Sequence, residues 1–194
     1  MDDSVIAAIA KWPNVPAVYG WLALTARGEW RLRGAAITNP AITAFIGRNY
    51  TSDDGGRWFF QNGPQRVFVD LEVAPWVWRV GTSEAPREVR AHNGSAARRL
   101  HGAWLDDQGR LFLRTDIGFG LVDSSDTRRV VETLRSGGRH LLNAEDFDAW
   151  LSGHGPSVRV CGELMGLQGD VELERLRADE APHRFGYVCV PRSE

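Results

Sequence analysis

The side chains that could act as proton carriers or metal ligands are spread along this sequence rather than gathered in a motif. None of the five histidines lies four residues from another, as two ligands on one face of a helix would, and no His-x-His occurs. They are His92, His101, His140, His154 and His183. This spacing favours scattered surface histidines over a metal centre, so we expect no metal and no cofactor.

A serine nucleophile is not indicated either. The Gly-x-Ser-x-Gly turn of many hydrolases is absent. Ser124 and Ser125 lie between Asp123 and Asp126, and this arrangement is explained more simply as the cap of a helix than as catalytic machinery. Catalytic carboxylates would have to converge from separate elements of the fold. The sequence names no catalytic residue and leaves open whether the chain is an enzyme.

The sequence lacks the usual motifs of nucleotide-binding sites. Lys11 is the only lysine, and no glycine-rich loop precedes it, which argues against a phosphate loop and a Schiff base. Gly118 and Gly120 flank Phe119 without the third glycine of a dinucleotide-binding turn.

Two small groups of residues are candidates for contacts with a ligand or partner. Arg114 and Asp116 end a predicted strand beside a glycine-bearing run, where a charged pair could bind an anion or a peptide end. The alternative is a surface ion pair that orders a turn. Trp76 and Trp78 lie on one face of a predicted strand with Arg79 on the other, and they form either core or an aromatic contact surface.

Composition limits the classes of partner. The 194 residues carry a formal charge of −2, and the basic pairs at 98–99 and 128–129 are too small to form a nucleic-acid patch. No run approaches the length of a membrane span, and the N-terminal apolar run is too short for a signal peptide. Cys161 and Cys189 are predicted to be reduced thiols. We therefore expect a cytoplasmic protein, without membrane or nucleic-acid binding, whose protein or small-molecule partner and oligomeric state stay unknown.

Strands dominate the pattern of predicted elements. Residues 58–61 and 66–72 flank Asn62-Gly63-Pro64, a sequence typical of a hairpin turn, and residues 75–80 are predicted to complete a three-stranded meander. A polar loop is expected over 51–56. Further strands are expected at 19–26, 29–33, 103–106, 110–115, 117–122, 157–161, 171–176 and 185–190.

Short helices are predicted where capping residues precede apolar residues at helical spacing. Asn39 and Pro40 start a helix over 41–50, and Asn143 starts another over 144–151. Others are expected near 4–10 and from Ser124 or Ser125 to about 135. Together these elements predict an α+β protein that is mainly β, built from antiparallel hairpins and meanders.

A weak internal repeat divides the chain. The pattern around Leu24, Gly28 and Trp30 returns around Leu105, Gly109 and Leu111, each time followed by a capped helix. The alternative is that unrelated hairpins look alike. The repeat predicts two similar α+β halves over 1–92 and 93–194, joined by the connection at 81–94 or packed as one compact unit.

Several segments resemble a family of uncharacterised bacterial proteins that is defined as a domain of unknown function. The segments are Gly28-Glu29-Trp30, 41–46, 56–60, 69–72, 75–77 and 111–118. The resemblance spans about residues 28–123, and the chain departs from the family pattern at Pro64-Gln65-Arg66, where an acidic residue is absent. It implies a small bacterial protein rich in β structure, and no activity or functional residue.

The function expected from the sequence is therefore a non-enzymatic binding or regulatory module that engages a protein or a small ligand. The alternative is an enzyme with a cleft between the two halves, in which scattered acidic or histidine side chains do the chemistry.

Overall fold

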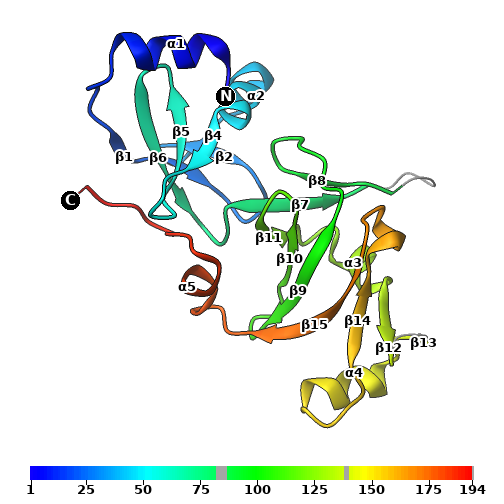
Figure 1. The fold of residues 1–194 in the computed structure, drawn as a ribbon. Helices are drawn as coiled ribbons and strands as arrows, with labels where there is room; N and C mark the ends of the chain where they lie inside the picture. Colours follow the sequence, from blue (N-terminus) through cyan, green and yellow to red (C-terminus); the bar gives the residue numbers. More distant parts are fainter. Residues whose placement is uncertain (82–86, 138–139, 194) are drawn as a thin grey trace. The chain divides into compact units, whose positions relative to one another are not determined.

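The structure, a computed structural model, describes residues 1–81, 87–137 and 140–193 (Figure 1). It is an α+β fold that is mainly β, as predicted. The helices are α1 (Asp3–Lys11), α2 (Pro40–Arg48), α3 (Thr127–Val131), α4 (Ala144–Leu151), α5 (Ala181–Phe185) and the 3-10 turn η1 (Gly162–Met165). The strands are β1 (Val18–Leu24), β2 (Trp30–Leu32), β3 (Ala35–Ala36), β4 (Tyr50–Ser52), β5 (Trp58–Asn62), β6 (Gln65–Leu71), β7 (Trp76–Val80), β8 (Val89–Ala91), β9 (Leu100–Asp106), β10 (Leu111–Thr115), β11 (Phe119–Val122), β12 (Leu134–Ser136), β13 (His140–Leu141), β14 (Val158–Cys161) and β15 (Asp170–Leu176).

The chain forms two compact units. Unit 1 consists of Met1–Pro75, His92–Gly94 and Glu180–Glu194, and unit 2 consists of Trp76–Ala91 and Ser95–Asp179. The assignment of 1–92 and 93–194 as two halves stays a prediction. The predicted connection at 81–94 includes residues 82–86, which lie outside the described residues.

Unit 1 is built on a six-stranded sheet with the order β3-β2-β1-β6-β5-β4. All neighbours are antiparallel except β1 and β6, which run parallel. Parallel strands need a long connection, and here the β2–β3 hairpin, α2, β4 and β5 supply it. The buried apolar side chains of Leu22, Leu24, Phe59, Val69 and Leu71 form much of the core of this unit.

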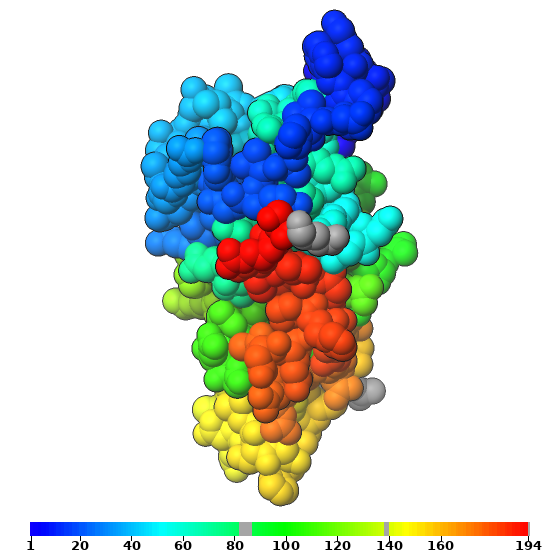
Figure 2. Space-filling view, turned by 90° about the vertical axis from the view of Figure 1, so that its left-hand side faces the viewer, coloured from blue at the N-terminus to red at the C-terminus, as the bar shows by residue number. Residues whose placement is uncertain are grey.

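The C-terminal segment closes one side of unit 1. The amide of Val188 donates to the carbonyl of Gly56 at 3.0 Å, and the amide of Leu71 donates to the carbonyl of Cys189 at 2.7 Å. Figure 2 shows this segment in red against blue and cyan parts of the same unit. A side chain at Gly56 would lie only 2.3 Å from the carbonyl oxygen of Gly186, so only glycine fits this contact.

Unit 2 contains a nine-stranded sheet with the order β13-β12-β14-β15-β9-β10-β11-β7-β8, in which the β15–β9 and β11–β7 pairs are parallel. Trp78 is fully buried, and its indole N–H donates to the carbonyl of Leu113 at 3.0 Å. Gly120 lies beneath the tryptophans, because an added Cβ would be 2.6 Å from the Cβ of Trp76.

The two sheets share an arrangement of strands. In unit 1, a three-stranded meander (β4-β5-β6) joins a hairpin (β1-β2) through the parallel pairing of β6 with β1. In unit 2, a three-stranded meander (β9-β10-β11) joins a hairpin (β7-β8) through the parallel pairing of β11 with β7. This order matches β1-β2 with β7-β8, whereas the predicted repeat aligns Leu24 with Leu105 in β9, so the repeat at those residues stays a prediction.

The turns of the two meanders are built alike. Asp53 accepts hydrogen bonds from the amides of Gly55 and Arg57 and forms an ion pair with Arg57 at 2.8 Å. Asp106 accepts from the amide of Gln108 and from both the amide and the guanidinium of Arg110, the latter at 2.7 Å. Asp53 and Asp106 therefore act as turn residues, a role that aspartate side chains favour.

The predicted meander over 58–80 is wrong in its third strand. β5 and β6 form the expected hairpin, but the strand that completes the meander is β4, within a segment predicted to be a loop. β7 belongs to the other sheet, where it pairs with β8 and β11. Strands that are neighbours in the sequence usually pair in space. Here β5 pairs with the preceding strand β4 as well as with β6, and β7 pairs in the other sheet.

Two other predicted elements differ from the structure. α3 ends at Val131 rather than near 135, because Leu134 begins strand β12, and its N-cap is Asp126 without a capping side-chain bond. Residues 185–190 form the end of α5 and a single bridge to Arg57 rather than a strand. By contrast, α4 has the predicted bounds, and the side chain of Asn143 caps it by accepting from the amide of Asp146 at 2.8 Å.

Across the described ranges, no helix is both long enough and apolar enough to cross a bilayer. Cys161 and Cys189 are free thiols.

Candidate functional site

An apolar groove lies in unit 1 between helix α2 and one face of the sheet. Its volume is about 360 Å³, and ten of the twelve residues that line it are apolar. The lining consists of Val18, Trp21, Leu22, Leu32, Ile37, Ile42, Phe45, Ile46, Phe60, Asn62, Gln65 and Val67. None of these side chains carries a charge, so the groove suits an apolar group.

Local sequence places α2 over the sheet. The side chain of Asn39 accepts from the amides of Ala41 and Ile42, and Pro40 occupies the first turn, where its missing N–H costs nothing. Ile42, Phe45 and Ile46 then share one stripe of the helix, which faces the groove. Ile46 is buried, whereas Ile42 is 48% exposed. The N-terminal end of the helix therefore leaves an apolar side chain uncovered.

A β-bulge in β1 turns Trp21 towards the groove. Val18 pairs with Val67 and Leu22 pairs with Val69, so three residues of β1 face a single residue of β6. The bulge contains Gly20 with φ +70°, a conformation that glycine adopts without strain.

The turn between β2 and β3 adds a second irregularity at the same place. Arg33 has φ +49° and Gly34 has φ +83°, as a type I′ turn requires. Arg33 is the only residue other than glycine with positive φ among the described residues. Its amide donates to the carbonyl of Trp21 at 2.7 Å, and its guanidinium carbon lies 3.7 Å from the centre of the Trp21 ring. A strained turn and a bulged strand therefore meet at one tryptophan on the groove.

The groove carries uncovered apolar surface. Trp21 and Leu32 are each 47% exposed, close to the exposure of Ile42 on the facing helix. Single exposed apolar side chains are ordinary, whereas three of them here line one apolar groove.

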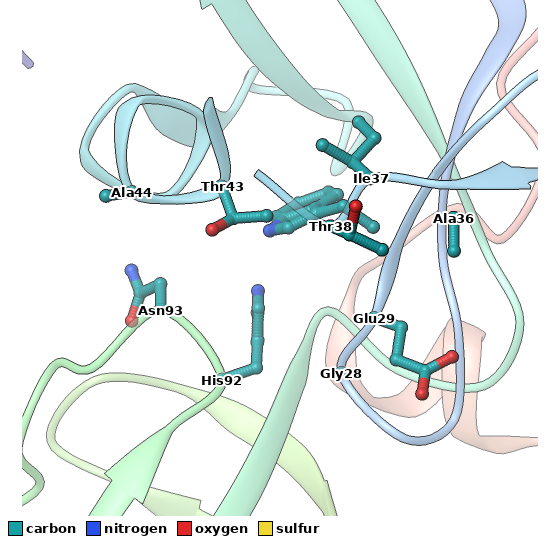
Figure 3. A pocket seen from close by; sticks show the side chains of 10 residues that line it. Gly28, Glu29, Ala36, Ile37, Thr38, Thr43, Ala44, His92 and Asn93 are labelled. Atoms are coloured by element: carbon teal, nitrogen blue, oxygen red, sulfur yellow. The ribbon is translucent and has the colours of Figure 1, made fainter. Parts of the chain in front are cut away.

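A second pocket in unit 1, of about 450 Å³, contains His92 and Glu29 (Figure 3). The imidazole of His92 packs edge-on against the rings of Trp30 and Tyr50, with centroids 5.3 and 5.8 Å away. Burial lowers the pKa of His92 to about 3, so the ring is neutral at pH 7.

The geometry of this pocket does not favour proton transfer. Nε2 of His92 is buried from solvent, and Figure 3 shows the carboxylate of Glu29 turned away from the imidazole. Asn93 beside it is held by a hydrogen bond from its amide to the carbonyl of Gly47 at 3.1 Å. The two titratable groups therefore do not converge on one point, as an acid–base pair must.

A third pocket, of about 590 Å³, gathers the acidic side chains of Glu29, Asp70 and Glu72 with Arg27 and Arg31. Burial raises the pKa of Asp70, and the charge of Arg192 opposes this shift. Glu72 accepts a hydrogen bond from the amide of Ala26 at 2.8 Å, a structural role.

One pocket of unit 2, of about 340 Å³, is lined by Arg87, Arg128 and Arg129 together with Glu132. Its arginines have acidic partners: Arg128 pairs with Glu132 at 3.2 Å, and Arg129 pairs with Asp126. The basic pair at 128–129 is thus largely neutralised, and it does not form an open basic patch. Among the residues with described structure, no group of three or more His, Cys, Asp or Glu could hold a metal ion.

The candidate contact residues lie in unit 2. Trp76 and Trp78 are 7% and 0% exposed, whereas Arg79 is half-exposed and pairs with Asp123 at 3.1 Å. Whether any of the three contacts a partner stays a prediction. The neighbouring Ser125 donates to Asp123 through its amide and hydroxyl, as part of a turn.

Arg114 and Asp116 do not form the ion pair considered from the sequence, as far as the described residues show. Asp116 instead accepts from the amides of Arg98 and Arg99 at 2.9 and 3.1 Å. Partial burial raises the pKa of Asp116, but these bonds outweigh it and leave the pKa below its ordinary value. Arg114 is exposed on β10. A contact role for either residue stays a prediction.

The apolar groove is not predicted by the sequence. The sequence predicts a strand over 19–26 and a helix over 41–50, but it does not indicate an apolar surface left uncovered between them. The available signals were a glycine within a strand pattern at Gly20, which indicates a bulge, and the dipeptide Arg33-Gly34 between two strand patterns.

Two solved structures resemble the chain. One, a DUF1285 family protein from Silicibacter pomeroyi DSS-3, is 16% identical with a TM-score of 0.47, covering 76% of this chain and all of that one. The other, a DUF1285 family protein from Shewanella baltica OS155, is 19% identical with a TM-score of 0.43, covering 57% of this chain and 90% of that one. No curated protein matches the chain. The model of the family DUF2944, described as "Protein of unknown function (DUF2946)", matches residues 1–192. This match confirms the predicted resemblance to a domain of unknown function, and the chain belongs to this family.

Proposed function

We propose that the protein is a non-enzymatic binding module and that its site is the apolar groove between α2 and the sheet of unit 1. The observation that carries the proposal is the exposure of Trp21, Leu32 and Ile42, each close to one half, around a groove with no charged lining residue. Covering these side chains with an apolar group removes their surface from water, which is favourable at about 25 cal/mol per Å².

Binding fits the described residues better than catalysis does. The groove has no acid, base or nucleophile in its lining. In the neighbouring pocket, the imidazole of His92 is neutral and its Nε2 is buried. An enzyme would need titratable groups directed at a reacting atom, and neither cavity supplies them.

We further propose that the module works in a bacterial cytoplasm, as the sequence predicts. The free thiols of Cys161 and Cys189 support this compartment, because cytosolic proteins keep cysteines reduced.

The experiment is a calorimetric binding titration with octan-1-ol, a neutral probe with a single apolar chain. We expect saturable binding at one site that Trp21→Ala weakens about tenfold, which corresponds to about 1.4 kcal/mol. The matched control is Trp12→Ala, because Trp12, directly after α1, is 51% exposed but does not line the groove. Absence of saturable binding, or equal loss in both variants, would contradict the proposal.

A further inference from the structure

A cation lies against Trp21 of the groove lining. The guanidinium of Arg33 lies over the indole of Trp21, with its central carbon 3.7 Å from the ring centre. Among the described residues, no carboxylate lies within ion-pair distance of Arg33, whereas Arg31 on the preceding strand β2 pairs with Glu29 at 3.7 Å. Arg33 therefore presents an uncompensated positive charge beside apolar surface.

The position of this cation is fixed by the backbone. Arg33 takes a positive φ in the two-residue turn between β2 and β3, where asparagine followed by glycine is the preferred sequence. An arginine here costs backbone strain, and such strain is concentrated where a side chain serves a function. The hydrogen bond from its amide to the carbonyl of Trp21, together with stacking on the indole, orders the guanidinium before any ligand binds.

We propose that the groove binds a single-chain fatty acid, with the acyl chain between α2 and the sheet and the carboxylate on Arg33. This inference rests on the proposed function and names its ligand class. Charge complementarity supports it, because an uncharged groove with one cation against its lining matches an apolar chain that ends in one anion.

Other ligands fit this arrangement less well. A doubly charged phosphate head group would call for more than one cation, whereas a carboxylate matches the planar fork of a single guanidinium. The groove volume of about 360 Å³ is near the lower end for small-molecule sites, which suits one chain rather than a fused-ring ligand. The amides of Asn62 and Gln65 mark the polar end of the groove, and the side chain of Gln65 is bonded to the carbonyl of Pro16 at 3.1 Å.

The test compares octanoate with octan-1-ol on the full chain at low ionic strength. We expect octanoate to bind about threefold to fivefold more tightly, the range that an exposed ion pair supplies, and the difference to shrink at high salt. Arg33→Asn should abolish the preference for octanoate over octan-1-ol, so that the ratio of the two affinities falls to about one. Because Asn-Gly is the preferred sequence for this turn, the variant should fold at least as well as the wild type. Arg31→Asn is the matched control and should change neither affinity.

A chain-length series from hexanoate to dodecanoate tests the position of the tail. Each additional methylene buried in the groove should tighten binding about fourfold, which is the fold-change for about 0.8 kcal/mol, until the groove is filled and the affinity levels off.

The outcomes separate this inference from the proposed function. Equal binding of octanol and octanoate, with no effect of Arg33→Asn, would overturn the fatty-acid ligand while the apolar binding site stands. Binding of neither probe would overturn both. A dimer that native mass spectrometry shows to dissociate in Trp21→Ala, with no octanoate bound, would assign the groove to a second copy of the chain and also overturn the inference.

Discussion

Arg33 and Trp21 are joined twice, by a hydrogen bond of 2.7 Å between their backbones and by the guanidinium of Arg33 stacked 3.7 Å from the indole centre. The arginine has a left-handed backbone conformation that ordinary residues adopt at a cost of about 1 kcal/mol or more. The turn therefore holds an exposed cation at the expense of its own stability.

Replacing Arg33 by Asn should raise the stability of the folded chain or leave it unchanged. Asparagine accepts positive φ more readily, which offsets the lost cation–π contact of about 0.5 to 1 kcal/mol. Urea unfolding measures the change, and Arg33→Ala is the informative comparison because alanine keeps the strain and also loses the stacking. If Arg33→Asn were clearly less stable than Arg33→Ala, the account of strain in this turn would be wrong.

The bulge in β1 should depend on Gly20. A Cβ at this position meets no atom within 4 Å, so Gly20→Ala tests backbone strain without steric overlap. We expect it to cost about 1 to 2 kcal/mol, the penalty of a left-handed conformation. Gly20→Asn should cost less. A neutral Gly20→Ala, measured by thermal unfolding, would show that the bulge is not fixed by this residue.

The neutral state of His92 should make unit 1 sensitive to acid. Its ordinary pKa is 6.5, and burial against the aromatic rings lowers the folded value to about 3. Between these values the unfolded state binds more protons than the folded state, so the stability present above pH 6.5 is lost as the pH falls. The slope reaches about 1.4 kcal/mol per pH unit.

His92→Phe keeps a ring in this position and removes the titrating group. Its unfolding free energy should therefore lose this dependence between pH 6 and 4, while the exposed His183→Gln variant keeps it. Parallel pH profiles for the wild type and His92→Phe would show that His92 is not buried as a neutral ring.

The titration of Asp70 should change the stability with pH in the direction opposite to that of His92. Burial raises its pKa, partly offset by Arg192, so the folded state holds its proton to higher pH than the unfolded state does. Its contribution is favourable in acid and is lost as the pH rises through the folded pKa. Asp70→Asn should therefore be at least as stable as the wild type at pH 7 and gain nothing at pH 3. A large loss of stability at pH 7, seen in urea titrations, would reveal a partner for the ionised carboxylate.

The turn at Asp106 should contribute more to stability than its exposed neighbours. Asp106 is 5% exposed and accepts from the amides of Gln108 and Arg110 and from the Arg110 guanidinium. Asp106→Ala removes these charge-assisted bonds and should cost about 2 to 3 kcal/mol. Asp54→Ala changes an exposed turn residue and should stay within about 0.5 kcal/mol. Equal effects in chemical denaturation would contradict this assignment.

Features fixed by neighbouring residues were predictable from the sequence. The caps at Asn39 and Asn143 determine where α2 and α4 begin, because the amides that they bind lie two or three residues away. The hairpin between β5 and β6 follows from the turn residues after Asn62, and the turn at Asp106 from its own sequence.

Features fixed by distant pairing were not predictable. β7 was assigned to the wrong sheet because its partner β11 lies some forty residues further along the chain. The groove depends on the parallel pairing of β1 with β6, whose register shift creates the bulge beside Trp21. A hydrophobic pattern reports which face of a strand is apolar, but it does not report which apolar side chains the fold leaves uncovered.

The most direct test of the binding site is an NMR titration of the tryptophan indole N–H signals with octanoate, with the Trp21 signal assigned from a Trp21→Phe variant. We predict that the Trp21 signal shifts in a saturable manner, while the signals of the exposed Trp12 and the buried Trp78 stay in place. An unchanged Trp21 signal at octanoate concentrations that shift other indoles would contradict the assignment of the groove as the binding site.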